Sequence, residues 1–163
     1  MDLERNLLLA IWLFGLLVNS TGVPSDKRHS FIIAFLTAQG LDWFAQIMFL
    51  QFEVLSFPVR EFPAASDMSI SLMILLMPLY TAIYVIYEPA KSRLIRAVYL
   101  VLWTSVATLT DIIISHFSGL QNHKSYYWLV AEIVFGVILA SSNAVVRWFF
   151  RSSPMSQGDR GNV

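Results

Sequence analysis

The composition of this chain excludes an ordinary soluble domain. Of its 163 residues, 56% are hydrophobic and 13% are charged, and the mean hydropathy is +0.62, whereas soluble domains carry about 25% charged residues. The formal net charge of zero gives no global attraction to nucleic acid. The absence of cysteine excludes disulfides, thiolate metal ligands and a cysteine nucleophile.

Five segments are apolar enough to be membrane-spanning helices, and the length leaves room for one membrane domain. A bilayer core about 30 Å thick needs roughly 20 mostly apolar residues per helix. The sequence therefore predicts an all-α, polytopic transmembrane helix bundle of about five spans, the first of them the shortest. The predicted spans are residues 7–23, 31–52, 68–87, 94–117 and 126–150.

The connections between these segments are polar or contain proline. Residues 24–30 (PSDKRHS), 88–93 (EPAKSR) and 117–125 (FSGLQNHKS) form polar loops or turns. Residues 53–67 mix apolar side chains with two prolines, which force the preceding residues toward extended backbone. We expect this loop to lie along the membrane surface or to dip into it.

Lysine and arginine are distributed unequally between the two sides that five spans create, eight against three. Because loops rich in these residues stay in the cytoplasm, we predict an outside N-terminus and a cytoplasmic C-terminus. The predicted organisation is a transmembrane five-helix domain over residues 1–151 and a disordered cytoplasmic tail over residues 152–163. The eight cations are Lys27, Arg28, Lys91, Arg93, Arg96, Arg147, Arg151 and Arg160, and the three are Arg5, Arg60 and Lys124.

Aromatic residues mark both ends of the last predicted span. Tyr126, Tyr127 and Trp128 begin it, and residues 148–150 (WFF) end it. Because amphipathic rings favour the headgroup region, these side chains are expected at the two membrane surfaces.

The first span has a second interpretation as a cleaved signal peptide. An apolar run of about a dozen residues followed by Ser20 and Gly22 is typical of such a peptide. The leader MDLER is not basic, however, and cleavage would leave Lys27 and Arg28 outside. Amino-terminal sequencing of the purified protein distinguishes the two.

Polar or small residues recur at helical spacing within three of the spans. Residues three, four or seven apart share one face of a helix. Because lipid would satisfy none of the polar groups, we expect the three stripes to face one another. They are Gln39, Asp42, Gln46 and Glu53 in the second span, Thr104, Thr108, Asp111, Ser115 and Ser118 in the fourth, and Glu132, Gly136, Ala140, Asn143 and Arg147 in the fifth.

The candidate site consists of three acids inside these stripes, Asp42, Asp111 and Glu132, together with Gln39 and Gln46. A charged side chain at the bilayer centre costs about 2.5 to 3.5 kcal/mol on insertion scales. The acids must therefore be protonated, paired or exposed to water, and at least one is expected to be neutral near pH 7. We expect them to satisfy each other in an intramembrane polar interior, which is also the candidate proton or cation site.

Two residues are candidate counter-ions for these acids. Arg60 and His116 both belong to the predicted outer end of the bundle. From the helical rise of about 1.5 Å per residue, Asp42 lies near mid-membrane, with Asp111 and Glu132 further outward. Any opening of the polar site is therefore expected on the exterior side of the membrane. We hypothesise that Arg60 folds down from its loop and pairs with Glu132 or Asp111.

The sequence does not support catalysis or metal binding. Asp111 and His116 are five residues apart, about 140° around a helix, so they cannot form a hydrogen-bonded pair within it. No histidine spacing matches a known metal site, and neither a phosphate-binding glycine loop nor a nucleophile elbow occurs. We predict no enzyme activity, catalytic residue, metal or cofactor.

Short motifs resemble a family of small five-span membrane proteins from spore-forming Firmicutes, described as uncharacterised. They are Phe57-Pro58-Val59-Arg60, Pro78, Tyr87-Glu88-Pro89, the acid Asp111 and the aromatic run ending in Trp128. The resemblance covers most of the chain from the second span onward. Where the family carries glutamate on the fourth span, this chain has the shorter Asp111. The resemblance implies residence in a bacterial inner membrane and carries no activity to transfer.

Two classes of function remain open from the sequence. In the favoured one, the chain is a non-enzymatic accessory or structural subunit of the cell membrane with a buried acidic core. In the alternative, it is a transporter that conducts or couples protons or small cations through the intramembrane carboxylates. No inverted repeat that would indicate alternating access is found. The expected partners are the lipid bilayer and either another membrane protein or further copies of the chain, and not nucleic acid.

Overall fold

The computed structural model describes residues 2–58, 75–89, 92–118 and 121–152, and these are almost entirely helical. This confirms the predicted all-α fold class. Two short turns, one π-helical (η1) and one 3-10 (η2), join the first two helices. The elements are α1 (Asp2–Leu17), η1 (Val18–Gly22), η2 (Ser25–Lys27), α2 (Arg28–Gln51), β1 (Leu55–Ser56), α3 (Met77–Tyr87), α4 (Arg93–Phe117), β2 (Asn122–His123) and α5 (Tyr127–Ser152).

Three helical stretches are long and apolar enough to cross a membrane, namely Ser25–Gln51, Arg93–Phe117 and Tyr127–Arg151. They coincide with the second, fourth and fifth predicted spans and indicate a membrane protein. Asn6–Leu17 and Met77–Tyr87 are shorter apolar helices. Residues 68–74, which begin the third predicted span, lie outside the described residues, so the number of five spans stays a prediction.

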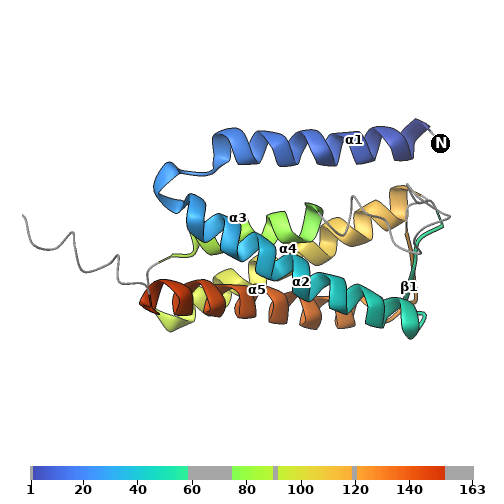
Figure 1. Cartoon of the computed structure of the whole chain (residues 1–163). Helices are drawn as coiled ribbons and strands as arrows, with labels where there is room; N and C mark the ends of the chain where they lie inside the picture. The colour runs from blue at the N-terminus through green and yellow to red at the C-terminus, as the bar shows by residue number, and fades with distance from the viewer. Residues whose placement is uncertain (1, 59–74, 90–91, 119–120, 153–163) are drawn as a thin grey trace, which may run out of the picture.

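Four helices, α2 to α5, form the bundle, and α1 lies beside it. α2, α3, α4 and α5 pack together, with the most extensive packing between α2 and α3 and further packing of α5 on α2 and α4. α1 runs along one side of this group (Figure 1). Buried Tyr84, Tyr127 and Leu139 are among the largest side chains of the core.

The ends of the helices follow ordinary local chemistry. The Ser92 side chain caps α4 by accepting from the Ile95 N–H at 3.5 Å. Pro78 lies in the first turn of α3, a position at which proline is common because its φ suits the helix. After α2 ends, Glu53 adopts a positive φ of 53°, the left-handed conformation that turns the chain away from the helix axis.

A small cap closes one end of the bundle. β1 and β2 pair in antiparallel fashion, Leu55 opposite His123 and Ser56 opposite Asn122, and the Lys124 N–H donates to the Val54 carbonyl at 3.1 Å. We call residues 53–58 and 121–126 the loop cap. It joins two loops that are far apart in the sequence, and its Leu55 and Phe57 side chains are buried. Residues 59–67, the rest of the loop predicted at the membrane surface, lie outside the described residues.

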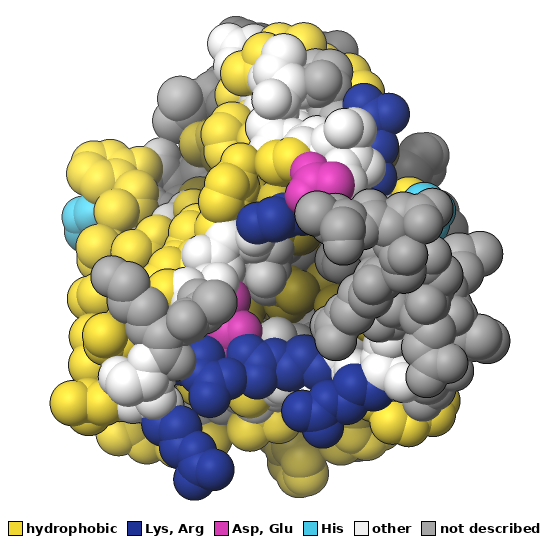
Figure 2. Space-filling model, turned by 90° about the vertical axis from the view of Figure 1, so that its left-hand side faces the viewer, with side chains coloured by type: hydrophobic (Ala, Val, Ile, Leu, Met, Phe, Trp, Pro, Cys, Tyr) yellow, Lys and Arg dark blue, Asp and Glu magenta, His cyan; other side chains and the backbone are white. Residues whose placement is uncertain are grey.

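The opposite end of the bundle is basic. The beginnings of α2 and α4 and the last turns of α5 meet there, and Lys and Arg side chains gather over this face (Figure 2). We call it the basic end; its described cations are Lys27, Arg28, Arg93, Arg96, Arg147 and Arg151. α5 runs to Ser152, and the predicted tail from residue 153 onward lies outside the described residues.

Candidate functional site

The carboxylate of Asp111, in the last third of α4, accepts hydrogen bonds from two side chains, one in the loop cap and one in α5. The Gln121 side-chain amide donates to Asp111 Oδ1 and, at 2.9 Å, to the Asp111 main-chain carbonyl. The Tyr127 hydroxyl, in the first turn of α5, donates to Asp111 Oδ2. Gln121 and Tyr127 are each only 2% exposed. Asp111 therefore ties α4 to both the loop cap and α5.

Asp42 lies on the inward face of α2 and is completely buried, with 0% of its surface exposed. Neither of its carboxylate oxygens has a hydrogen-bond partner among the described residues. The Gln46 side chain, one turn along α2, lies close to this carboxyl group, and Asp111 is near enough for the two acids to interact electrostatically. The two carboxyl groups thus share one site but differ in how they are satisfied.

A small cavity of about 30 Å³ lies between these acids. A water molecule needs about 10 to 15 Å³ of such volume, so the cavity can hold one or two. We call it the polar cavity. It is lined by Asp42, Gln46, Phe57, Leu76, Met77, Tyr80, Ala107, Asp111, Gln121 and Phe135. It lies beneath the loop cap and adjoins α2, α3, α4 and α5.

The structure brings together three of the five predicted site residues and leaves two apart. Asp42, Gln46 and Asp111 line the polar cavity, whereas Gln39 and Glu132 do not. Glu132 is half-buried, and its Oε1 accepts a 2.9 Å hydrogen bond from the Ser105 hydroxyl across the contact between α4 and α5. The expected convergence of all three acids therefore reduces to a pair, with Glu132 in a separate helix contact.

Of the two candidate counter-ions, only His116 lies within the described residues, and it does not line the polar cavity. His116 is exposed, and its ring lies edge-on to Phe117 with 5.1 Å between centroids. Arg60 lies outside the described residues, so its predicted pairing with Glu132 or Asp111 stays a prediction. Glu53, predicted to extend the stripe on the second span, lies beyond the end of α2 and is exposed.

The stripe on α4 has the predicted orientation. Thr104, Thr108 and Ser118 are all buried, and Asp111 lies among them on the inward face. Thr104 faces Gly136 of α5, and a Cβ built on that glycine would lie 3.8 Å from the Thr104 side chain. This distance is an ordinary van der Waals contact, so an alanine would also fit between the two helices at this position.

A second polar cluster occupies the basic end. The Asn143 side-chain amide donates to Glu88 Oε1 at 3.0 Å, and Arg147 forms an ion pair with the other Glu88 oxygen. Arg147 Nε also donates to Asn143 Oδ1 at 3.2 Å. This cluster ties the chain after α3 to the last turns of α5.

Sequence reasoning missed the residues contributed by loops. Tyr127 was expected at the membrane surface, but its ring is buried against Phe49, with 5.8 Å between centroids, and its hydroxyl reaches Asp111. Gln121 and Glu88 lie in connections, where there is no helical spacing to reveal a face. For Gln121 the available signal is an amide in a loop that follows an acid-bearing span.

The described residues contain no group of three or more His, Cys, Asp or Glu side chains that could hold a metal ion. Comparison of the chain with protein-family models, curated proteins and solved structures gave no match. The family resemblance of the short motifs therefore stays a prediction, and the function is argued from the geometry.

Proposed function

We propose that the chain is a multi-pass protein of the cell membrane with its N-terminus outside and its C-terminus in the cytoplasm. Two observations support this orientation. The basic end gathers six described cations around the beginnings of α2 and α4 and the end of α5 (Figure 2). The loop cap at the other end carries Lys124 as its described cation. The positive-inside rule then places the basic end in the cytoplasm.

Cysteine labelling tests this orientation directly, because the natural chain has no cysteine. In intact cells, a membrane-impermeant maleimide is expected to label Ser125→Cys, in the loop cap, without cell lysis. Ser153→Cys, after α5, is expected to react only after lysis. The reverse pattern overturns the orientation.

Within this membrane, the proposed role is that of a non-enzymatic accessory or structural subunit. The observation that carries this proposal is the separation of the polar interior into two compact clusters. Along α5, Phe135 lines the polar cavity and Asn143 belongs to the cluster at the basic end; these residues are eight apart, about 12 Å along the helix. A proton relay needs groups within hydrogen-bond distance, about 3 Å, so the clusters do not form a continuous path.

Each cluster instead connects elements that are far apart in the chain. Asp111, Gln121 and Tyr127 join α4, the loop cap and α5, and Glu88 with Arg147 joins the two ends of the chain segment 88–147. In membranes, interhelical hydrogen bonds contribute roughly 0.6 to 2 kcal/mol each. Two such ties at opposite ends of a bundle are suited to holding its shape while its lipid-facing surface meets another membrane protein.

A second candidate function, proton exchange, rests on Asp42. An unpaired carboxyl group that is fully buried is costly to ionise and is most readily kept as the neutral acid. A neutral acid beside a cavity with room for water can release and regain a proton. Two buried hydroxyls, Thr81 and Ser142, lie on the helices between the clusters and have no hydrogen-bond partner among the described residues. With intervening water, these hydroxyls would extend a path from the polar cavity toward the basic end.

Reconstituted vesicles separate the two functions. The wild-type protein, Asp42→Asn and the control Glu53→Gln, which changes an exposed acid outside α2, are placed in proteoliposomes with a pH-sensitive dye inside. An accessory subunit gives proton flux no greater than empty vesicles in all three. Flux that is present in the wild type and in Glu53→Gln, but lost in a folded Asp42→Asn protein, overturns the accessory role and establishes proton exchange.

A further inference from the structure

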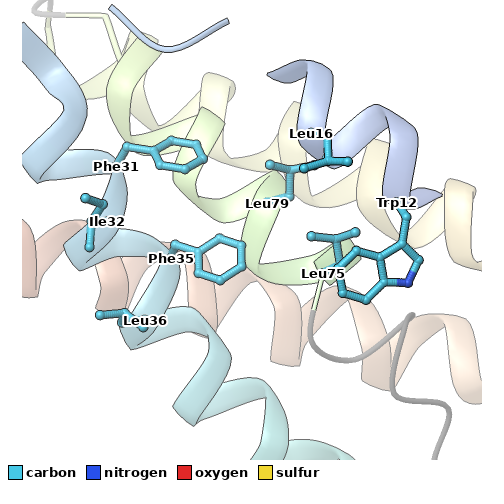
Figure 3. Close-up of a pocket in the computed structure, with 9 residues that line it drawn as sticks. Trp12, Leu16, Phe31, Ile32, Phe35, Leu36, Leu75 and Leu79 are labelled. Atoms are coloured by element: carbon cyan, nitrogen blue, oxygen red, sulfur yellow. The ribbon is translucent and has the colours of Figure 1, made fainter. Parts of the chain in front are cut away.

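An apolar groove runs between α1 and the pair formed by α2 and α3, in a different part of the molecule from the polar cavity. Its volume is about 300 Å³. Trp12 and Leu16 come from α1, Phe31, Phe35 and Leu36 from α2, and Leu79 from α3 (Figure 3). Among the described residues that line it, every side chain is apolar and one residue is a glycine.

The groove lies beside the line along which α1 packs on the bundle. Ile11 is buried, and Leu7 and Leu8 pack against the same core cluster. A Cβ built on Gly15 would lie 3.0 Å from the Leu75 methyl groups, so glycine permits a close contact there. The neighbouring side chains of α1, Trp12 and Leu16, line the groove instead. The stacked rings of Phe31 and Phe35, 6.2 Å between centroids, form one wall.

The groove lies in the half of the bundle next to the basic end. Phe31 is one helical turn from Arg28, and Leu36 is eight residues from Arg28, about 12 Å along the axis. One leaflet of a hydrocarbon core is about 15 Å thick. The groove therefore extends through the depth of a single leaflet, with its polar limit at the beginning of α2.

The cations at that limit differ in what they already contact. Lys27 Nζ donates to the Ile86 carbonyl at 2.7 Å and lies 5.7 Å from the centre of the Tyr87 ring. The Arg28 side chain is exposed and makes neither a hydrogen bond nor an ion pair with any other described residue. Arg28 is therefore the cation beside the groove that is able to meet an anion.

The chemistry of the groove and of its polar limit favours an acyl chain over a partner helix. A phospholipid carries its anionic group at one end of an apolar chain, which matches described walls that are apolar and an exposed Arg28 at one end of them. A flexible hydrocarbon chain gains from burial against apolar walls. We propose that the groove binds an acyl chain of an anionic phospholipid from the leaflet at the basic end, and that Arg28 contacts the headgroup phosphate. This inference requires the proposed membrane embedding but neither candidate function.

Native mass spectrometry of the detergent-purified protein tests the site. Phosphatidylglycerol and phosphatidylcholine with identical acyl chains are titrated separately. One tightly bound phosphatidylglycerol is expected, with affinity about fivefold above phosphatidylcholine, as is typical for one cation near a charged lipid. Arg28→Gln removes this preference, whereas Arg93→Gln, another exposed cation of the basic end, keeps it.

Groove-filling variants test the apolar half of the site. Leu16→Trp places a larger side chain in the groove, and its matched control is Leu13→Trp on the same helix, 67% exposed and outside the groove. Leu16→Trp is expected to weaken binding of both lipids about tenfold, and Leu13→Trp to change it less than twofold. Leu36→Trp, on the opposite wall, provides an independent variant if Leu16→Trp does not fold.

Three results overturn the inference. Equal affinity for the two lipids in the wild type removes the role of Arg28. Lipid binding that survives both groove-filling variants assigns the lipid to the general annulus. A lipid-free dimer that Leu16→Trp dissociates, but Leu13→Trp does not, assigns the groove to a second copy. Reversed cysteine labelling would contradict the proposed orientation without changing lipid binding in detergent, so the two failures are distinguishable.

Discussion

The polar cavity has a volume of about 30 Å³ and lies under the loop cap, whereas the apolar groove has a volume of about 300 Å³ and lies beside α1 near the basic end. The cavity is closed by hydrogen bonds from Gln121 and Tyr127. The described side chains that bound the groove are apolar and therefore offer no hydrogen bonds. In a lipid environment, therefore, polar groups draw the elements of this chain tightly together, and purely apolar faces leave room for lipid.

The largest expected effect tests whether the polar cavity holds the loop cap in place. Asp111→Ala leaves the buried Tyr127 hydroxyl without this acceptor and removes one of the two Asp111 oxygens that the Gln121 amide contacts; a buried group left unpaired costs about 1 to 3 kcal/mol. We expect a loss of about 3 kcal/mol in the free energy of unfolding in detergent. Glu53→Ala, which removes an exposed acid, is the control. An equal effect in both variants would contradict the role given to Asp111.

A smaller change isolates a single bond of the same site. Tyr127→Phe keeps the ring packing on Phe49 and removes only the hydroxyl that donates to Asp111. The expected loss is about 1 to 2 kcal/mol, measured by the same unfolding experiment. Tyr126→Phe changes the neighbouring ring, which is 50% exposed, and is expected to have almost no effect. If the two variants behave alike, the Tyr127 hydroxyl does not stabilise the site.

Helical spacing correctly predicted which polar side chains face inward on α2 and α4. Asp42 and Gln46 are four residues apart on α2, and Asp111 follows Thr104 and Thr108 on α4; all were assigned to inward faces, where the structure places them. The same rule put Glu132 inward with its stripe. It cannot specify which neighbour a face meets, and Glu132 instead meets Ser105.

The loop contributions to the polar clusters and the apolar groove depend on information that helical spacing does not contain. Gln121 and Glu88 lie in loops, so their positions are set by the tertiary path of the chain. The groove was not predicted because a leucine that lines it, such as Leu16, has the same sequence pattern as an exposed one, such as Leu13. The placement of α1 against the bundle distinguishes them, and the close contact between Gly15 and Leu75 contributes to that placement.

Two glycines provide a matched test of the close contact between α1 and Leu75. Gly40→Ala introduces a Cβ with nothing within 4 Å, so the gain in helix propensity should raise the free energy of unfolding by up to about 1 kcal/mol. Gly15→Ala gains the same propensity but brings a Cβ to 3.0 Å from Leu75, so its net effect should be close to zero. A stabilisation of equal size at both positions would show that α1 does not need the close approach.

The smallest expected effect concerns Asp42, and its smallness is informative. Asparagine keeps the shape of aspartate and cannot ionise, so Asp42→Asn replaces a carboxyl group that makes no hydrogen bond among the described residues with a neutral group of similar size. If Asp42 is held as the neutral acid, the free energy of unfolding at neutral pH should change by less than about 0.5 kcal/mol. A loss as large as that of Asp111→Ala would mean that Asp42 is ionised and paired in the folded protein. A negligible loss would mean that packing does not require an acid at position 42. The reason for an acid there would then be its ability to bind and release a proton.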